Sequence, residues 1–278
     1  KFGNVTEYAK LAVAIDAARI ASGIRSNTTL VGPAVAGFGT NVTWQFLEAC
    51  GQLGCFRAFD AVSMHAYRNS EEGPESILPD LKKLKGILHN DSVKLISGEW
   101  GWSTCNPSQP PPNSSFHFNC GVSNSVADEL GAARNLARQW LTNTYAGVVV
   151  SIYYDFIDDC PNPFDRECRF GTVRADRTPK PSYTAAWTLQ QYLGGKRFQK
   201  RIGAADENSY ALAFEGNRLA VWNVPVAGQS KNGTCPAHDS LPTVRVNCGH
   251  DGTTKEECED AGCCFSFPPP TFGPQCFL

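Results

Sequence analysis

The alternation of strand-like and helix-like segments constrains the fold of this chain more than any other feature. Apolar runs of strand length are each followed by a segment whose apolar residues recur at helical spacing. Strands that alternate with helices pair in parallel through right-handed crossovers, which requires a doubly wound sheet or a β/α barrel. The expected strands are 29–35, 59–67, 93–102 and 147–156, and the expected helices are 4–23, 43–52, 77–88, 125–141 and 181–193.

Four such repeats supply half of an eight-stranded barrel, which needs roughly 250 residues for the barrel alone. We therefore expect residues 1–197 to form the C-terminal half of a barrel. Because the sequence begins with Lys1 and carries no signal peptide, we expect a processed product or a piece of a longer chain.

The remainder of the chain has a different pattern. Residues 209–214 and 218–223 alternate apolar and polar side chains around Glu215-Gly216-Asn217, which is typical of an antiparallel hairpin. We expect a β extension over 198–224, a linker over 225–234 and a small cysteine-rich module over 235–278.

Twelve cysteines fall in local groups, and such grouping indicates disulfides or zinc. Six Asn-x-Ser/Thr sequons accompany them, at Asn4, Asn27, Asn41, Asn90, Asn113 and Asn232. Paired histidines at zinc-ligand spacing are missing from the sequence, so disulfides are favoured and no metal is expected. The pattern predicts a glycosylated protein that is secreted or held in the lumen of the secretory pathway. Three local pairs are expected outside the C-terminal module: Cys50 with Cys55, Cys105 with Cys120, and Cys160 with Cys168.

Charge and motifs exclude several function classes. A net charge of -2 gives no electrostatic footprint for nucleic acid, and the longest apolar stretch, 145–156, is about half the roughly 20 residues that a transmembrane helix needs. The motifs of serine hydrolases, zinc proteases, kinases and dinucleotide-binding enzymes are all missing from the sequence, and no organic cofactor is expected.

The chemistry of a barrel enzyme lies where its strands end. Three of the expected strands end in polar and aromatic residues, near His65-Ala66-Tyr67, Glu99-Trp100 and Tyr153-Tyr154. Retaining glycoside hydrolysis needs two carboxyl groups about 5 to 5.5 Å apart, one of which attacks the anomeric carbon. Glu99 fits the attacking group, although a single glutamate at a strand end is also common as a solvated loop residue.

Residues 94–104, KLISGEWGWST, resemble the seventh strand of the clan A barrel glycosidases, a group that includes families 5 and 39. His65 and Tyr67 match the His-x-Tyr that often ends the sixth strand there. The resemblance implies a retaining glycosidase with Glu99 as nucleophile, Tyr67 bonded to its carboxylate, and a glycan or glycoside substrate. It further implies substrate contacts by His65, Trp100, Trp102 and Tyr153.

The proton donor of that clan is a glutamate in an Asn-Glu pair that ends the fourth strand. No such pair stands near Asn4, where the corresponding helix begins. The resemblance therefore implies a donor upstream of Lys1 and a chain that is inactive by itself. The alternative is a non-catalytic, lectin-like protein that binds carbohydrate.

The last six cysteines are separated by twelve, nine, four, zero and eleven residues. This spacing, with CGHDGTTKEECEDAGCCF at 248–265, resembles the trefoil (P-type) domain. The resemblance implies the pairs Cys235 with Cys264, Cys248 with Cys263, and Cys258 with Cys276. Gln275 stands where glycan-binding trefoils carry tryptophan, so a structural module is favoured.

Overall fold

The computed structural model describes two compact units. The first unit comprises Lys1–Arg68, Ser76–Gly101 and Ala146–Tyr154, and the second comprises Asn69–Glu75, Trp102–Tyr145 and Asp155–Leu278. The residues described are 4–68, 73–89, 92–105, 128–203, 208–224, 254, 264–265 and 276–277.

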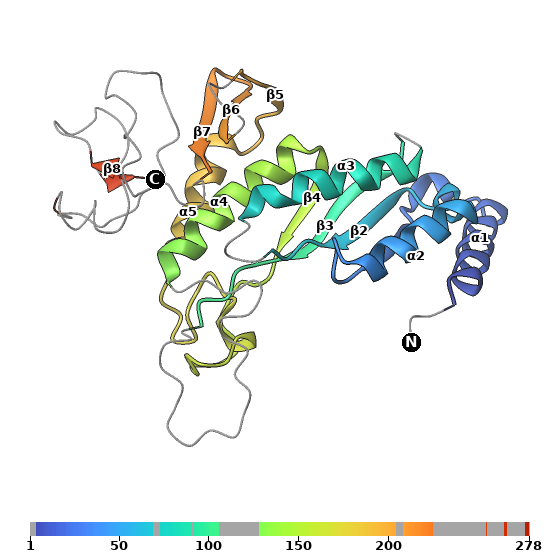
Figure 1. The fold of residues 1–278 in the computed structure, drawn as a ribbon, viewed down its shortest axis with the longest axis horizontal. Coiled ribbons are helices and arrows are strands. Elements are labelled where there is room, and N and C mark those ends of the chain that lie inside the picture. The colour runs from blue at the N-terminus through green and yellow to red at the C-terminus, as the bar shows by residue number, and fades with distance from the viewer. Residues whose placement is uncertain are drawn as a thin grey trace. The chain divides into compact units, whose positions relative to one another are not determined.

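The first unit is built on a parallel four-stranded sheet, as the alternation of segments predicted. Its strands are β1 (Val31–Val35), β2 (Ala61–His65), β3 (Lys94–Trp100) and β4 (Val148–Tyr153), in that order across the sheet. The helices of this unit are α1 (Val5–Ala21), α2 (Asn41–Gln52) and α3 (Ile77–Leu88) (Figure 1). Among the described residues, β1 and β4 each pair on one side only, so the sheet is open and not closed into a barrel.

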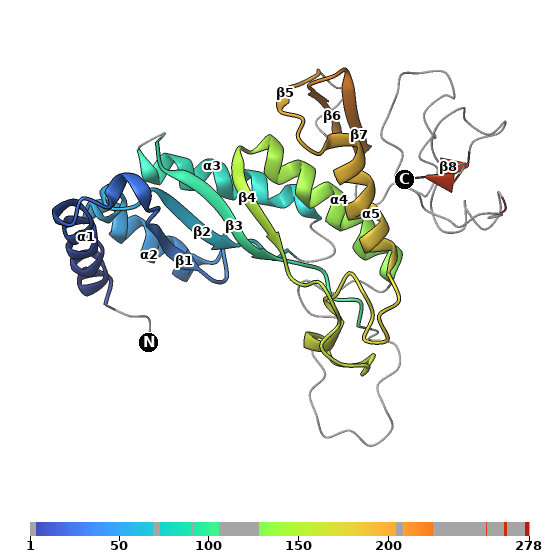
Figure 2. The same cartoon turned by 180° about the vertical axis from the view of Figure 1, so that it is seen from behind.

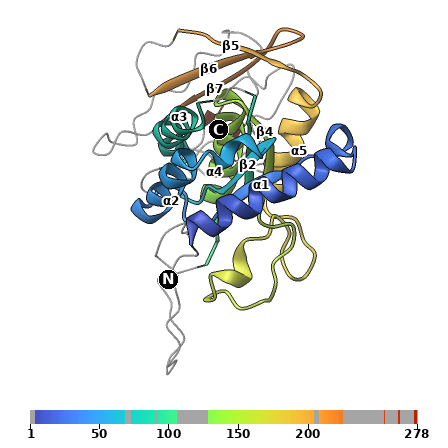
Figure 3. The same ribbon diagram turned by 90° about the vertical axis from the view of Figure 1, so that its right-hand side faces the viewer.

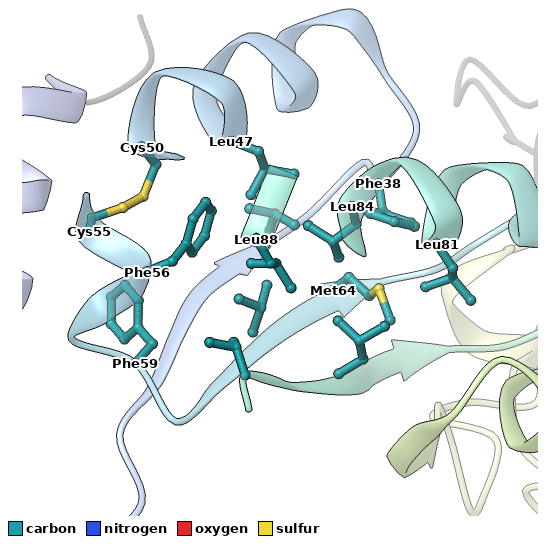
Figure 4. Close-up of a cluster of buried hydrophobic side chains, with 14 of the residues drawn as sticks. Phe38, Leu47, Cys50, Cys55, Phe56, Phe59, Met64, Leu81, Leu84 and Leu88 are labelled. Carbon is teal, nitrogen blue, oxygen red and sulfur yellow. A yellow bond between two sulfur atoms is a disulfide. The ribbon is translucent and has the colours of Figure 1, made fainter. Parts of the chain in front are cut away.

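Helices α2 and α3 run alongside the strands and share one apolar core with them (Figure 2). In α3, apolar residues recur every three or four positions, which lines one face of the helix. Figure 4 shows this face meeting side chains from α2 and β2. Buried members of the core include Leu47, Val62, Met64, Leu81, Leu84, Leu88 and Leu95.

The core decides which side chains of β2 are available for a site. Val62 and Met64 are buried in this core, and Figure 4 shows Met64 among the leucine side chains of α3. Because successive strand residues point to opposite faces, Ser63 and His65 fall on the face away from that core. The disulfide between Cys50 and Cys55 lies at the end of α2, with both cysteines fully buried.

The second unit contains two packed helices and a small antiparallel sheet. Helix α4 (Glu129–Tyr145) packs against α5 (Pro181–Leu193). Strands β5 (Phe198–Arg201), β6 (Ser209–Phe214) and β7 (Arg218–Asn223) lie side by side in Figure 3, and their core includes Leu212 and Phe214. The hairpin of β6 and β7 was expected, whereas β5 is an additional strand.

The segment that precedes α5 is held by buried charges and a disulfide between Cys160 and Cys168. Lys180 and Asp158 are both 0% exposed and form an ion pair of 2.6 Å. Arg169 approaches the other oxygen of Asp158 at 3.0 Å, and Lys180 also donates to Thr104. Burial lowers the pKa of Lys180, and the hydrogen bond to Asp158 opposes that shift.

Lys180→Met is expected to destabilise this unit by about 3 kcal/mol, because it leaves a buried carboxylate that has lost one of its two cations. Urea unfolding measures the loss. Lys10→Met is a matched control, because Lys10 forms an exposed pair with Glu7, whose loss should cost less than about 1 kcal/mol. Equal losses in the two variants would contradict a stabilising role for the Lys180 pair.

Asp155 begins the same segment and titrates unusually. Burial, followed by the nearby Asp159 and Asp158, raises the pKa of Asp155 to about 6, while Lys180 opposes the shift. Within the part of the chain that the structure describes, its buried Oδ1 has no hydrogen-bond partner. The folded protein therefore disfavours the ionised form of this carboxyl.

The free energy of unfolding is consequently expected to decrease as the pH rises from about 4 to about 6, because in this range the folded chain holds a proton that the unfolded chain has released. Asp155→Asn should remove this loss. The rise in the pKa of Asp155 from 3.8 to about 6 corresponds to about 3 kcal/mol. Because Asp155 is partly exposed, we expect Asp155→Asn to raise the free energy of unfolding at pH 7.5 by only about 1 kcal/mol. Urea unfolding at pH 4.5 and 7.5 provides the check, and a variant whose advantage does not grow with pH would refute the argument.

Strands β8 (Cys264–Phe265) and β9 (Cys276–Phe277) pair antiparallel in the C-terminal module. The other trefoil cysteines, Cys235, Cys248, Cys258 and Cys263, lie outside the described residues, so each implied trefoil pair stays a prediction. Cys105 is disulfide-bonded, and its expected partner Cys120 also lies outside the described residues. The linker at 225–234 and the sequons at Asn90, Asn113 and Asn232 also lie outside the described residues. The sequon residues Asn4, Asn27 and Asn41 are exposed.

Candidate active site

Glu99 stands at the end of β3, where a parallel sheet presents its functional groups. Its side chain is 34% exposed. The backbone is fixed from β2, because Ala66 N donates to Glu99 O at 2.9 Å and His65 is its register partner. The carboxylate therefore projects from a fixed strand end and stays open to solvent.

Two side chains from β2 and the residues just after it contact the two carboxylate oxygens. The Tyr67 hydroxyl donates to Glu99 Oε1 at 2.5 Å. His65 Nδ1 lies 3.5 Å from Glu99 Oε2, with 30% of the histidine side chain exposed. The hydrogen bond between Tyr67 and Glu99 that the sequence resemblance implied is present in the structure. Together these contacts orient the carboxylate at the strand end.

The two tryptophans expected to stack on sugars have no ring face available. Trp100 and Trp102 are each 1% exposed. The Trp100 indole nitrogen donates to Ser151 Oγ at 2.9 Å, and its ring meets Tyr153 edge to face at 5.0 Å. Trp100 thus joins β3 to β4 and holds the backbone beside Glu99. The structure therefore does not support the expected sugar stacking by Trp100 and Trp102, whereas Tyr153 is partly exposed.

Glu99 is the one acidic residue at the described strand ends of the first unit. None of the described residues 36–40, 66–68, 101 and 154, which directly follow the strands in this unit, is an aspartate or glutamate, and Asp155, the next residue after Tyr154, belongs to the second unit. Among the described residues, no group of three or more His, Cys, Asp or Glu side chains is placed to hold a metal ion. The geometry therefore offers an oriented nucleophile or general base, with no second carboxylate beside it in these segments.

Sequence reasoning missed one charged residue at this edge. Arg68 directly follows Tyr67 and is buried, with its guanidinium bonded to backbone carbonyls and to Asp80. The available signal was its position, because an arginine that follows a buried strand needs partners. Two of those partners, Phe38 and Asp80, lie 30 and 12 residues away in the sequence.

Comparisons with known proteins give one result for the C-terminal module and another for most of the chain. Residues 239–278 match the family model of the trefoil (P-type) domain. No curated protein matches the sequence. A glucosidase from Croceicoccus marinus has a similar structure at 16% identity, with a TM-score of 0.50 over 76% of this chain and 41% of that chain. A family 39 glycoside hydrolase from Bacteroides cellulosilyticus is 22% identical, with a TM-score of 0.49 over 69% of this chain and 40% of that chain.

The likeness to the glucosidase shows a shared fold, and the trefoil match identifies the C-terminal module. The expected fold class, part of an α/β barrel followed by a trefoil domain, is therefore shown. The chain spans 41% of the length of the glucosidase. No helix among the described residues is long and apolar enough to cross a membrane.

Proposed function

We propose that this chain carries the nucleophile of a retaining glycoside hydrolase, with Glu99 as the attacking group. The observation that supports the proposal is the paired contact on Glu99, in which Tyr67 donates to one oxygen and His65 lies beside the other. An oriented, partly exposed carboxylate at a barrel strand end suits attack on an anomeric carbon. The glycosidase fold of the glucosidase neighbour is consistent with this chemistry.

The proposed reaction has two displacements. A Glu99 oxygen bonds to the anomeric carbon as the glycosidic bond breaks, and a general acid protonates the departing oxygen. The same acid, now a base, then takes a proton from water as the water oxygen replaces Glu99 on the anomeric carbon. Tyr67 keeps the carboxylate oriented in both steps, and His65 and Tyr153 line the sugar site.

We place the general acid of this proposal outside these 278 residues. The described residues 36–40, 66–68, 101 and 154, which directly follow the strands, carry no second carboxylate, and the open sheet leaves β1 and β4 without the neighbours that would close a barrel. In the clan that residues 94–104 resemble, the acid ends the fourth strand. We therefore propose that residues upstream of Lys1 supply both the acid and the missing strands.

Proton NMR of the first product tests this function in a chain extended to a closed barrel. A retaining enzyme releases a sugar with the anomeric configuration of its substrate. The opposite configuration would refute the double displacement, and binding of glycans without turnover would establish the lectin-like alternative.

The proposed location is the secretory route or the cell exterior, which fits the disulfides and the trefoil module.

A further inference from the structure

Arg68 is the buried cation closest in sequence to the candidate site. It follows Tyr67 directly, and its side chain is 7% exposed. The guanidinium Nη1 donates to the carbonyl of Tyr67 at 3.1 Å and to the carbonyl of Phe38 at 2.8 Å. Arg68 therefore ties the backbone of Tyr67 to the segment between β1 and α2.

The same guanidinium is also held from α3. Its Nη2 lies 2.5 Å from Asp80 Oδ2, and Asp80 stands in the first turn of that helix. A charge-assisted hydrogen bond of this kind is about twice as strong as a neutral one. Arg68 further lies over the ring of Phe38, 5.7 Å from its centre. The guanidinium of Arg68 thus bonds to the segment between β1 and α2, to the residue Tyr67 after β2, and to helix α3.

Gly39 shows that the neighbouring backbone is shaped around this pair. A Cβ at this position would lie 2.8 Å from Asp80 Oδ2 and 3.2 Å from Arg68 Nη1. The backbone of Gly39 also has a φ of +103°, which residues other than glycine rarely adopt. The close approach of Gly39 leaves the guanidinium little room to move.

We propose that Arg68 and Asp80 are positioning residues for the nucleophile: by fixing the Tyr67 carbonyl they aim the Tyr67 hydroxyl at Glu99. The inference rests on the proposed function of Glu99. The hydroxyl reaches Glu99 from a residue that lies beyond the end of β2, so the strand ladder alone does not set its direction. The Arg68 fork holds that residue from its carbonyl side.

The test combines Arg68→Gln, Arg68→Lys and Asp80→Asn with a matched control. Lys83→Gln removes an exposed ion pair between α3 and Glu48 of α2, together with a cation over the ring of Trp44, and leaves the bonds between Arg68 and Asp80 in place. The first measurement is the NMR resonance of 13Cζ-labelled Tyr67 in the 278-residue chain. The second is the rate at which a 2-deoxy-2-fluoroglycosyl fluoride labels Glu99 in the chain extended to a closed barrel.

Arg68→Gln should shift the Tyr67 resonance and slow labelling by roughly tenfold to a hundredfold, because a small misplacement of a reacting group has effects of this size. Arg68→Lys should restore part of the rate, since an ammonium cannot reproduce the planar fork. Lys83→Gln should match the parent in both measurements. A folded Arg68→Gln variant with the parental resonance and rate would overturn the proposal.

Two further outcomes are informative. If Arg68→Gln fails to fold, Asp80→Asn keeps the arginine and should still shift the resonance, and a parental resonance there would overturn the proposal. If the parent is not labelled, the proposed function fails, and the Tyr67 resonance alone decides whether Arg68 positions that side chain.

Discussion

Replacing Glu99 with glutamine is expected to reduce glycoside turnover by at least 10²-fold in a chain extended to a closed barrel, with the fold unchanged. The amide keeps the shape of the side chain and still accepts from Tyr67, but it cannot attack as an anion. Glu48→Gln is the matched control, because Glu48 is an exposed glutamate of α2 that pairs with Lys83. Its activity should equal that of the parent.

Steady-state hydrolysis of an activated aryl glycoside measures both variants, and circular dichroism checks the fold. Turnover by Glu99→Gln above about one hundredth of the parental rate would remove Glu99 from the nucleophile role. Loss of turnover in the Glu48 variant would show instead that the assay reports stability.

The 278-residue chain is expected to hydrolyse a natural glycoside about 10²-fold to 10⁴-fold more slowly than the extended chain, because we propose that the general acid lies upstream of Lys1. An aryl glycoside with an activated leaving group needs less protonation. The difference between the two chains should therefore be smaller for that substrate than for the natural one.

Equal rates of the two chains on the natural substrate would place the acid within these residues. Asp155 would then be the first carboxyl to test, because its raised pKa of about 6 leaves it partly protonated near neutral pH. Equal losses on the two substrates would indicate a binding defect from the missing strands and not a missing proton donor.

Local sequence signals were sufficient for most of the fold. The bounds of β6 and β7 match the prediction because Gly216 and Asn217 both adopt positive φ at the turn, which their residue types favour. Strand β5 (Phe198–Arg201) was missed because its sequence, Phe-Gln-Lys-Arg, has a single apolar residue. That strand is antiparallel to β6, and the local sequence of β5 does not indicate this pairing.

The site was predictable where it depends on adjacent strands. Tyr67 and Glu99 meet because β2 and β3 are parallel neighbours whose ends lie at the same edge. The burial of Trp100 depends instead on Ser151 and Tyr153 of β4, about fifty residues later. A tryptophan beside a nucleophile therefore has the same local pattern whether it stacks on a sugar or on the core.

Arg68 illustrates the same limit for charges. Its partners, the carbonyl of Phe38 and the carboxylate of Asp80, come from the segments on either side of it in the chain. Only the fold brings them together, so the sequence pattern at 65–67 indicates the site without the residue that anchors it.

Covalent labelling tests the central claim most directly. The extended chain is incubated with a 2-deoxy-2-fluoroglycosyl fluoride, digested with protease, and mapped by mass spectrometry. We predict one added sugar on the peptide that contains Glu99, and none in the Glu99→Gln variant. A stable adduct on another carboxylate, or hydrolysis of substrate with no adduct at Glu99, would contradict the assignment.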